Sequence, residues 1–272
     1  MRVWKSIDFF AGIGAWELAI NLVNLISQVK FQTIELIEIN PQAQAVLQSH
    51  FSHIPIYPDV RSYIPTKHEA NLYLISFPCT GTSAAGTKTG LSHEESGLWF
   101  EALRCISIGQ PDFVVVEQPA GFIDRGLRTV LDGFRMARYQ TEVEVISASE
   151  CGAPHERKRV FVIAYANHLS IRQRQNFCCW SEQLGKHITI AKSFTSHSET
   201  QPCFLCLDDG ISGYLGGISF DNWWKFNQPP ATAGIQPRTL GRRESVNLYG
   251  KSIVPQCAAI ALMRIQFLMS IV

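Results

Sequence analysis

The chain has 272 residues, of which 46% are hydrophobic and 17% are charged. This length and composition are typical of one large folded domain with a smaller lobe, and they exclude a low-complexity chain. The formal net charge is only +1, so a basic surface for nucleic acid must come from local clusters of Lys and Arg.

The two ends of the chain carry no recognisable targeting signal. The N-terminal MRVWKSIDFF lacks a long apolar stretch followed by a cleavage site. The C-terminal CAAIALMRIQFLMSIV is too short to span a bilayer and contains Arg264 and Gln266, so we expect a packed helix there. Eight cysteines without a secretion signal indicate free thiols in a reducing, cytoplasmic setting, and no membrane association is expected.

From residue 1 to about 166, apolar runs alternate with helical patterns. This alternation predicts an α/β fold with a doubly wound, mostly parallel sheet. The expected strands are Lys5–Phe10, Thr33–Ile39, Leu72–Phe77, Phe113–Glu117, Glu142–Ser147 and Val160–Ala164. The expected helices are Gly14–Ser27, Pro41–Phe51, Glu95–Gly109 and Asp124–Ala137.

After residue 167 the periodic hydrophobic pattern of the chain changes. Residues 168–235 show no sustained period, and we expect them to form a small lobe separate from residues 1–167. Residues 236–272 are expected to pack back on the large domain, with helical spacing from Val254 to Ile271.

The first predicted strand leads into Phe10-Ala11-Gly12-Ile13-Gly14 and then into a helix. Glycines at such a turn let a ligand approach the backbone beside a helix N-terminus. Glu38 ends the second predicted strand, where a carboxylate can accept hydrogen bonds from a ribose. Glu17 stands where a third glycine would complete the phosphate-binding pattern. These features favour a nucleoside cofactor without phosphates, such as S-adenosylmethionine, over NAD.

A second motif, FPCTGTSAAG at residues 77–86, follows a buried strand. Cys79, between Pro78 and a loop of Thr, Gly and Ser, is better placed as a nucleophile than as a filler of the core. Glu117 ends another predicted strand, and Arg157 and Arg159 alternate so that both point to one face of a third. The sequence thus predicts a thiol, an acid and two guanidinium groups in one site.

Five blocks in this order resemble the DNA cytosine-C5 methyltransferases: FFAGIG at 9–14, FPCTGTSAAG at 77–86, VVVEQPAGF at 114–122, GAPHERKRVFVIA at 152–164 and GKSIVPQ at 250–256. The resemblance covers most of residues 5–166 and about 236–265. It implies a Rossmann-like, S-adenosylmethionine-dependent catalytic domain at 1–167, a DNA-recognition lobe at 168–235, and double-stranded DNA as the partner of a monomeric enzyme. We expect the protein to be a DNA modification enzyme of a bacterium or a bacteriophage.

The resemblance also assigns roles to individual residues. Cys79 adds to C6 of a flipped-out cytosine, Glu117 binds N3 of the base, and Arg157 and Arg159 serve the target base and the catalytic loop. Contacts with the donor are implied for Phe10, Ala11, Gly12, Ile13, Gly14, Glu38, Ile39, Asp59, Val60, Pro78, Leu98, Lys251 and Ser252. Contacts with DNA are implied for Ser83, Arg172, Arg174, Arg238, Arg242 and Arg243.

Several positions depart from the family pattern. Thr80 and Thr82 replace a Gln and an aromatic residue, which enlarges the expected pocket. Lys251 stands where the family has Asn near the donor, and a second cation beside a sulfonium calls for a negative partner. Two donors therefore remain open: S-adenosylmethionine, or carboxy-S-adenosylmethionine, whose carboxylate would pair with Lys251 and lead to carboxymethyl transfer.

Two alternatives to a DNA enzyme also remain. One is the same chemistry on transfer RNA, although the Cys-Phe-Thr signature of that branch is absent. The other is an inactive DNA-binding paralogue. No metal is expected, because Cys178, Cys179, Cys203 and Cys206 do not have the paired C-x-x-C spacing of zinc sites.

Overall fold

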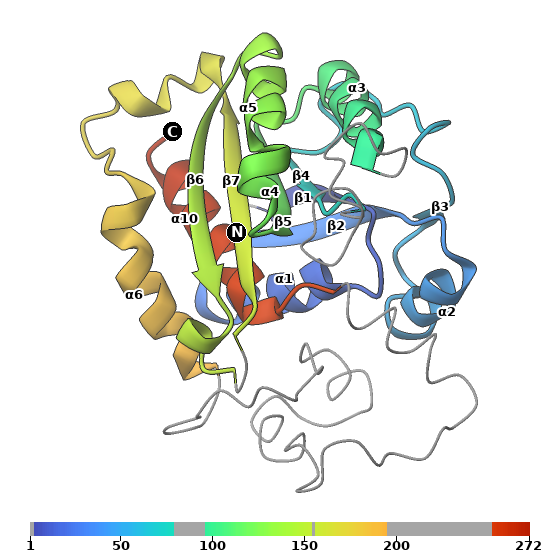
Figure 1. Cartoon of the computed structure of the whole chain (residues 1–272), viewed down its shortest axis with the longest axis horizontal. Helices are drawn as coiled ribbons and strands as arrows, with labels where there is room; N and C mark the ends of the chain where they lie inside the picture. The colour runs from blue at the N-terminus through green and yellow to red at the C-terminus, as the bar shows by residue number, and fades with distance from the viewer. Residues whose placement is uncertain (1–2, 79–95, 154–155, 195–251) are drawn as a thin grey trace, which may run out of the picture.

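A computed structural model describes residues 3–78, 96–153, 156–194 and 252–272. Its centre is a seven-stranded sheet in the order β3-β2-β1-β4-β5-β7-β6 (Figure 1). The strands are β1 (Val3–Phe9), β2 (Lys30–Ile37), β3 (Ile56–Tyr57), β4 (Leu72–Ile75), β5 (Phe113–Pro119), β6 (Tyr139–Ser147) and β7 (Lys158–Ala166). The pairs from β3 to β5 are parallel, whereas β7 is antiparallel to both β5 and β6.

Helices cover both faces of this sheet (Figure 1). The α-helices are α1 (Ala15–Ile26), α2 (Pro41–His50), α3 (Trp99–Gly109), α4 (Phe122–Arg125), α5 (Leu127–Met136), α6 (Trp180–Ser193) and α10 (Pro255–Ser270). Short 3-10 turns lie at Ser96–Leu98, Ser149–Cys151, Asn167–Leu169 and Ile171–Gln173. None of the helices within the described ranges has the length and apolar character that a membrane span requires.

Two hydrophobic clusters lie on opposite faces of the sheet. One contains the buried side chains of α1, α2, α6 and α10, and the other contains those of α3 and α5. The central strands are buried on both faces, as β4 and most of β5 show, because helices cover them on either side. The doubly wound α/β class and the mostly parallel sheet predicted from the sequence are confirmed.

Several predicted boundaries differ from the observed ones. The helix expected from Asp124 to Ala137 is two helices, α4 and α5, because Gly126 between them has a non-helical backbone with φ −158° and ψ −21°. The two antiparallel strands, β6 and β7, are longer than expected. The two-residue strand β3 was not predicted, since so short a segment has no period to detect.

Helix α6 falls inside the segment that the sequence analysis assigned to a separate lobe. Its buried residues are Trp180, His187 and Ala191, and both Trp180 and Ala191 belong to the same cluster as α1 and α10. Residues 168–194 therefore share the core of the large domain. The rest of the expected lobe, residues 195–235, lies outside the described residues.

Candidate active site

The turn from β1 into α1 has three residues with positive φ: Phe10 at 61°, Gly12 at 57° and Gly14 at 89°. A Cβ on Gly14 would lie 2.4 Å from Cε2 of Phe51, so glycine is required there for steric as well as conformational reasons. The turn is fixed by the amide of Ala11, which donates to the carbonyl of Ile37 at 3.0 Å. The backbone is thus held in a sharp turn at the carboxyl end of β1.

Glu38, just after β2, lies against this turn. Its Oε2 accepts a hydrogen bond from the amide of Gly12 at 2.7 Å, and its Oε1 accepts one from the amide of Asn40 at 2.7 Å. The strand order reverses between β1 and β4, which is where ligands bind in open α/β sheets. The structure thus fixes the Glu38 carboxylate at the end of β2 beside the glycine turn, and its contact with a ribose stays a prediction.

The other residues that were predicted to contact the donor do not all face the same hydrophobic cluster. Phe10, Val60 and Leu98 all pack on the hydrophobic cluster of α3, so they lie on the same side of the sheet. Ile39, which follows Glu38, is 57% exposed. Ala11 and Ile13 instead point into the cluster of α1 and α10.

Asp59 has a local structural role. Its carboxylate pairs with Arg61 at 2.7 Å and accepts the amide of Arg61 at 3.0 Å. These bonds lower the pKa of Asp59. Asp59 is thus held in a local turn with Arg61, and its contact with the donor stays a prediction.

The predicted acid and one predicted arginine form an ion pair. Arg159 of β7 donates its Nε to Oε1 of Glu117 at 2.7 Å, and both side chains are largely buried. Burial raises the pKa of Glu117, whereas Arg159 and then Arg157 lower it. The carboxyl group is thus held in one orientation and shifted toward its protonated form.

Arg157 lies next to this pair and links two distant segments. Its guanidinium Nη2 donates to the carbonyl of Ser252 at 2.7 Å, 95 residues further along the chain. Ser252 lies just before α10, so the C-terminal block is attached to the start of β7. The structure therefore brings Glu117, Arg157, Arg159 and Ser252 together.

Gln118 also contributes to the site, although it was not among the residues predicted from the sequence. Its Nε2 donates to the carbonyl of Phe77 at 2.7 Å, and the bond is buried. Phe77 and Pro78 immediately precede Cys79. The signal was available in the sequence, because Gln118 is a polar residue directly after the predicted acid Glu117.

Six predicted site residues lie outside the described residues: Cys79, Ser83, Arg238, Arg242, Arg243 and Lys251. The same holds for Cys203 and Cys206. Among the residues that are described, no three His, Cys, Asp or Glu side chains are grouped as a metal site would need.

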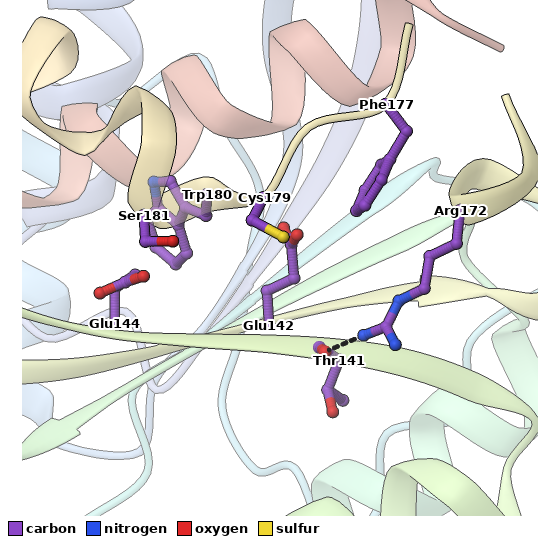
Figure 2. Close-up of a pocket in the computed structure, with 8 residues that line it drawn as sticks. All are labelled: Thr141, Glu142, Glu144, Arg172, Phe177, Cys179, Trp180 and Ser181. Carbon is purple, nitrogen blue, oxygen red and sulfur yellow. Dashed lines mark hydrogen bonds between the residues drawn. The ribbon is translucent and has the colours of Figure 1, made fainter. Parts of the chain in front are cut away.

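Both described arginines that were expected to contact DNA donate hydrogen bonds within the protein. Arg172 donates its Nε to the hydroxyl of Tyr165 and its Nη2 to the carbonyl of Thr141, both at 2.8 Å. Figure 2 shows Arg172 reaching β6 across a pocket of about 300 Å³ that is also lined by Glu142, Glu144, Phe177, Cys179, Trp180 and Ser181. Arg174 donates to the carbonyl of Leu169 at 3.3 Å. The bonds of Arg172 attach the segment after β7 to the sheet, whereas the bond of Arg174 lies within that segment. DNA contact by either arginine stays a prediction.

Comparison with known proteins agrees with this geometry. The family described as C-5 cytosine-specific DNA methylase matches residues 4–203. The chain belongs to this family. Among its curated relatives, the type II methyltransferase M.CviJI of Paramecium bursaria Chlorella virus IL3A is 30% identical over 164 residues, which are 59% of this chain and 43% of the relative. The type II methyltransferase M.HhaI of Haemophilus parahaemolyticus is 26% identical over 177 residues, which are 64% and 51% of the two chains. The matched region thus spans about half the length of these curated relatives.

Solved structures with the same fold include the Dnmt2 methyltransferase of S. pombe, with a TM-score of 0.60, 14% identity and 98% of each chain covered. A putative DNA modification methyltransferase from an E. coli prophage has a TM-score of 0.63 and 14% identity, with 98% of this chain and 99% of that chain covered. At this identity the likeness concerns the fold alone. Family and fold together support S-adenosylmethionine as the cofactor of this C5 methylase family member.

Proposed function

We propose that this protein transfers an alkyl group from an S-adenosylmethionine-type donor to carbon 5 of cytosine in double-stranded DNA. The observation that carries the proposal is the buried ion pair of Glu117 and Arg159, beside Arg157, in a chain that the family matches over residues 4–203. Glu117 directly follows Val116, which pairs with Ile75 at the end of β4. The acid therefore lies at the sheet edge from which the chain continues toward Cys79.

The chemistry begins with the target base. Carbon 5 of cytosine is a poor nucleophile, so the Cys79 thiolate first adds to C6. The electron pair of the C5–C6 double bond moves toward N3, where a proton from Glu117 neutralises it. C5 would then form its new bond to the donor carbon while the bond of that carbon to the sulfonium sulfur breaks, so that a neutral thioether leaves with the electron pair. N3 returns its proton to Glu117, solvent accepts the C5 proton, and expulsion of the Cys79 thiolate restores the aromatic ring and the free enzyme.

Glu117 suits the task of an acid at N3. Its burial raises the pKa, which favours the protonated form that can donate a hydrogen bond. Arg159 at 2.7 Å fixes the orientation of the carboxyl group and limits this shift. The net effect of these opposed influences is a pKa of Glu117 above its ordinary value.

The donor would be held by the glycine turn of Gly12 and Gly14, by Glu38 and by the apolar side chains of Phe10, Val60 and Leu98. When bound, it supplies an electrophilic carbon on a sulfonium. The identity of the transferred group depends on Lys251, which lies outside the described residues. A methyl group and a carboxymethyl group are the two candidates, and the second requires a salt bridge between Lys251 and the donor carboxylate.

The reacting carbons of cytosine lie inside the base stack of a duplex. The proposal therefore includes extrusion of the target nucleotide into the site, at a cost of a few kcal/mol in unstacking. Arg157 and Arg159 are the groups that would contact the extruded base and its phosphate.

The decisive experiment is trapping on DNA that contains 5-fluorocytosine, which blocks loss of the C5 substituent. The wild-type protein should form a covalent complex with this DNA in the presence of donor, and Cys79→Ser should form none. Cys179→Ser is the matched control, because Cys179 is an exposed thiol on the β6 side of the molecule. Equal trapping by Cys79→Ser and the wild type would refute the assigned nucleophile, and the absence of any complex would favour an inactive DNA-binding protein.

The modified nucleoside shows which nucleic acid is the substrate and which donor supplied the transferred group. Nucleoside mass spectrometry after incubation with duplex DNA or transfer RNA, and with each donor in turn, identifies the modified nucleic acid and the transferred group. If Lys251→Asn leaves donor preference unchanged, carboxymethyl transfer through Lys251 is wrong.

A further inference from the structure

Trp16 joins the turn after β1 to the segment that leads to Cys79. It stands in the first turn of α1 and is only 1% exposed. Its indole Nε1 donates a hydrogen bond to the hydroxyl of Ser76 at 2.9 Å, across 60 residues of sequence. Ser76 directly follows β4 and precedes Cys79 by three residues. The transfer chemistry proposed above involves neither Trp16 nor Ser76.

Ser76 is bonded to both ends of the donor turn, by which we mean residues 10–14. Its backbone amide donates to the carbonyl of Phe9, the last residue of β1, at 3.3 Å. Its hydroxyl accepts the indole N–H of Trp16. Phe9 comes before the donor turn and Trp16 comes after it, so a shift of either end of the turn acts directly on Ser76.

The residue after Ser76 is bonded to the strand of the proposed acid. The carbonyl of Phe77 accepts a hydrogen bond from Nε2 of Gln118 at 2.7 Å, and Gln118 directly follows Glu117 on β5. Two consecutive residues before Cys79 are thus held by different parts of the site. Ser76 is held by the donor turn, and Phe77 is held by the acid strand.

The ring of Trp16 packs against the strand that carries Arg159. It meets Phe161 of β7 edge-on, with ring centroids 6.2 Å apart and an interplanar angle of 86°. Phe161 is paired with Glu117 across β5 and β7, so these two side chains point to the same face of the sheet. Packing of a buried ring against the sheet fixes its orientation, and the indole N–H is thereby directed at Ser76.

We propose that Trp16 and Ser76 are positioning residues of the transfer reaction, whose hydrogen bond couples the donor turn to the segment that carries the nucleophile. This inference rests on the proposed function. The Cys79 sulfur bonds to C6 of the base while the donor carbon approaches C5, the neighbouring ring atom. Thiol and donor must therefore be held at a fixed separation, and small displacements of such groups are costly in rate.

Coupling of this kind is reciprocal. A ligand in the donor turn fixes both of the groups that bind Ser76, and a base held at Cys79 fixes the segment that Ser76 begins. Each ligand should therefore raise the affinity of the protein for the other by the same factor. Loss of the Trp16 bond should reduce this factor and the rate of transfer, with little effect on the affinity for the donor alone.

The binding test uses the full chain and S-adenosylhomocysteine, the thioether product, which cannot transfer a group. Its affinity is measured by calorimetry without DNA and with a saturating duplex that the wild-type protein modifies. In the wild type, DNA should raise this affinity at least about fivefold. In Trp16→Phe and in Ser76→Ala the increase should be less than about twofold, and the affinity without DNA should stay within about twofold of the wild type.

A double-mutant cycle on the single-turnover rate shows whether the two side chains act through one bond. Trp16→Phe keeps an aromatic ring for Phe161, and Ser76→Ala keeps the backbone amide for Phe9. Each should lower the rate about tenfold, and the double variant should lose no more than either single one, because all three lack the same bond. Ser76→Thr, which retains a hydroxyl, should keep most of the wild-type rate.

Trp4→Phe is the matched control for the loss of an indole. Trp4 is also buried and packs edge-on against Phe113, again with ring centroids 6.2 Å apart, but it lies at the start of β1. This variant should keep the wild-type rate and the wild-type effect of DNA on ligand affinity.

Three results would overturn the inference alone: wild-type rate and coupling in Trp16→Phe or Ser76→Ala, losses that multiply in the double variant, or no effect of DNA on ligand affinity in a wild type that traps 5-fluorocytosine DNA. A wild-type protein that neither traps this DNA nor binds S-adenosylhomocysteine would overturn the proposed function, and the inference with it.

Discussion

Gln118 of β5 and Phe77, two residues before Cys79, are joined by a buried hydrogen bond of 2.7 Å from Nε2 to the carbonyl oxygen. This bond ties the segment that leads to the proposed nucleophile to the strand that carries the proposed acid. Two catalytic groups on different strands are thereby kept in a fixed relation. Small displacements of such groups have large effects on rate.

Replacing Gln118 by Leu should separate the effect on rate from the effect on folding. The substitution leaves the Phe77 carbonyl buried and unpaired, at a cost of about 1–3 kcal/mol in the free energy of unfolding. The single-turnover rate of transfer should fall by at least about tenfold. Gln118→Asn, which keeps an amide on a shorter side chain, should recover part of the rate lost in the Leu variant. A Leu variant with the wild-type rate would show that the bond does not position Cys79.

Arg159→Gln should change the pH dependence of transfer. Arg159 lowers the pKa of Glu117 against the effect of burial, so its removal lets that pKa rise further. If the protonated acid is the active form, activity should persist to higher pH in the variant, although the maximal rate falls. The measurement is the pH profile of the single-turnover rate. Arg159→Lys should shift the profile less because it keeps the charge, and Arg174→Gln should not shift it. An alkaline limb that stays at the wild-type pH would argue against Glu117 as the acid.

Much of this fold was predictable because the strands of a doubly wound sheet are apolar and end in recognisable turns. FFAGIG marks the turn after β1, and LYLISF marks the strand before Cys79. Helix α6 was not predictable in the same way. Only Trp180, His187 and Ala191 of its 14 residues are buried, and Gly185 interrupts the pattern. Its helical state depends on packing with α10, which is distant in the sequence.

The candidate site, too, was only partly predictable from the sequence. Glu117, Arg157 and Arg159 were identified from their types and positions, but their pairing depends on the antiparallel register that places Glu117 opposite Phe161. That register follows from strand β7 entering between β5 and β6, and no local pattern encodes it.

Arg264→Met should strongly destabilise the protein. Arg264 is fully buried and donates to both carboxylate oxygens of Glu142, at 2.9 and 2.7 Å, and to the side-chain oxygen of Gln183 at 2.6 Å. Removing the guanidinium leaves a largely buried carboxylate unpaired, which costs about 3–5 kcal/mol. The free energy of unfolding in urea measures this cost.

Two further variants serve as controls for the stability of Arg264→Met. The double variant Arg264→Met with Glu142→Leu should recover most of the lost stability, because no unpaired charge remains. Arg61→Met, which breaks the exposed pair with Asp59, should cost no more than about 1 kcal/mol. A loss for Arg264→Met as small as that for Arg61→Met would mean that α6 and α10 are not held together by this contact.

Glu17→Gln should alter how stability depends on pH, without any ligand. The folded-state pKa of Glu17 is about 7, against an ordinary value of 4.5, so the folded protein binds more protons than the unfolded chain between these values. The free energy of unfolding therefore falls as pH rises through this window, by an amount on the order of 3 kcal/mol for this residue. Gln cannot ionise, yet it still accepts the hydrogen bond from Thr33. The variant should therefore gain stability relative to the wild type from about pH 4.5 to about pH 8, as urea denaturation at a series of pH values would show. Glu182→Gln should run parallel to the wild type, and a Glu17→Gln curve that did the same would mean that Glu17 is ionised in the folded protein throughout the range.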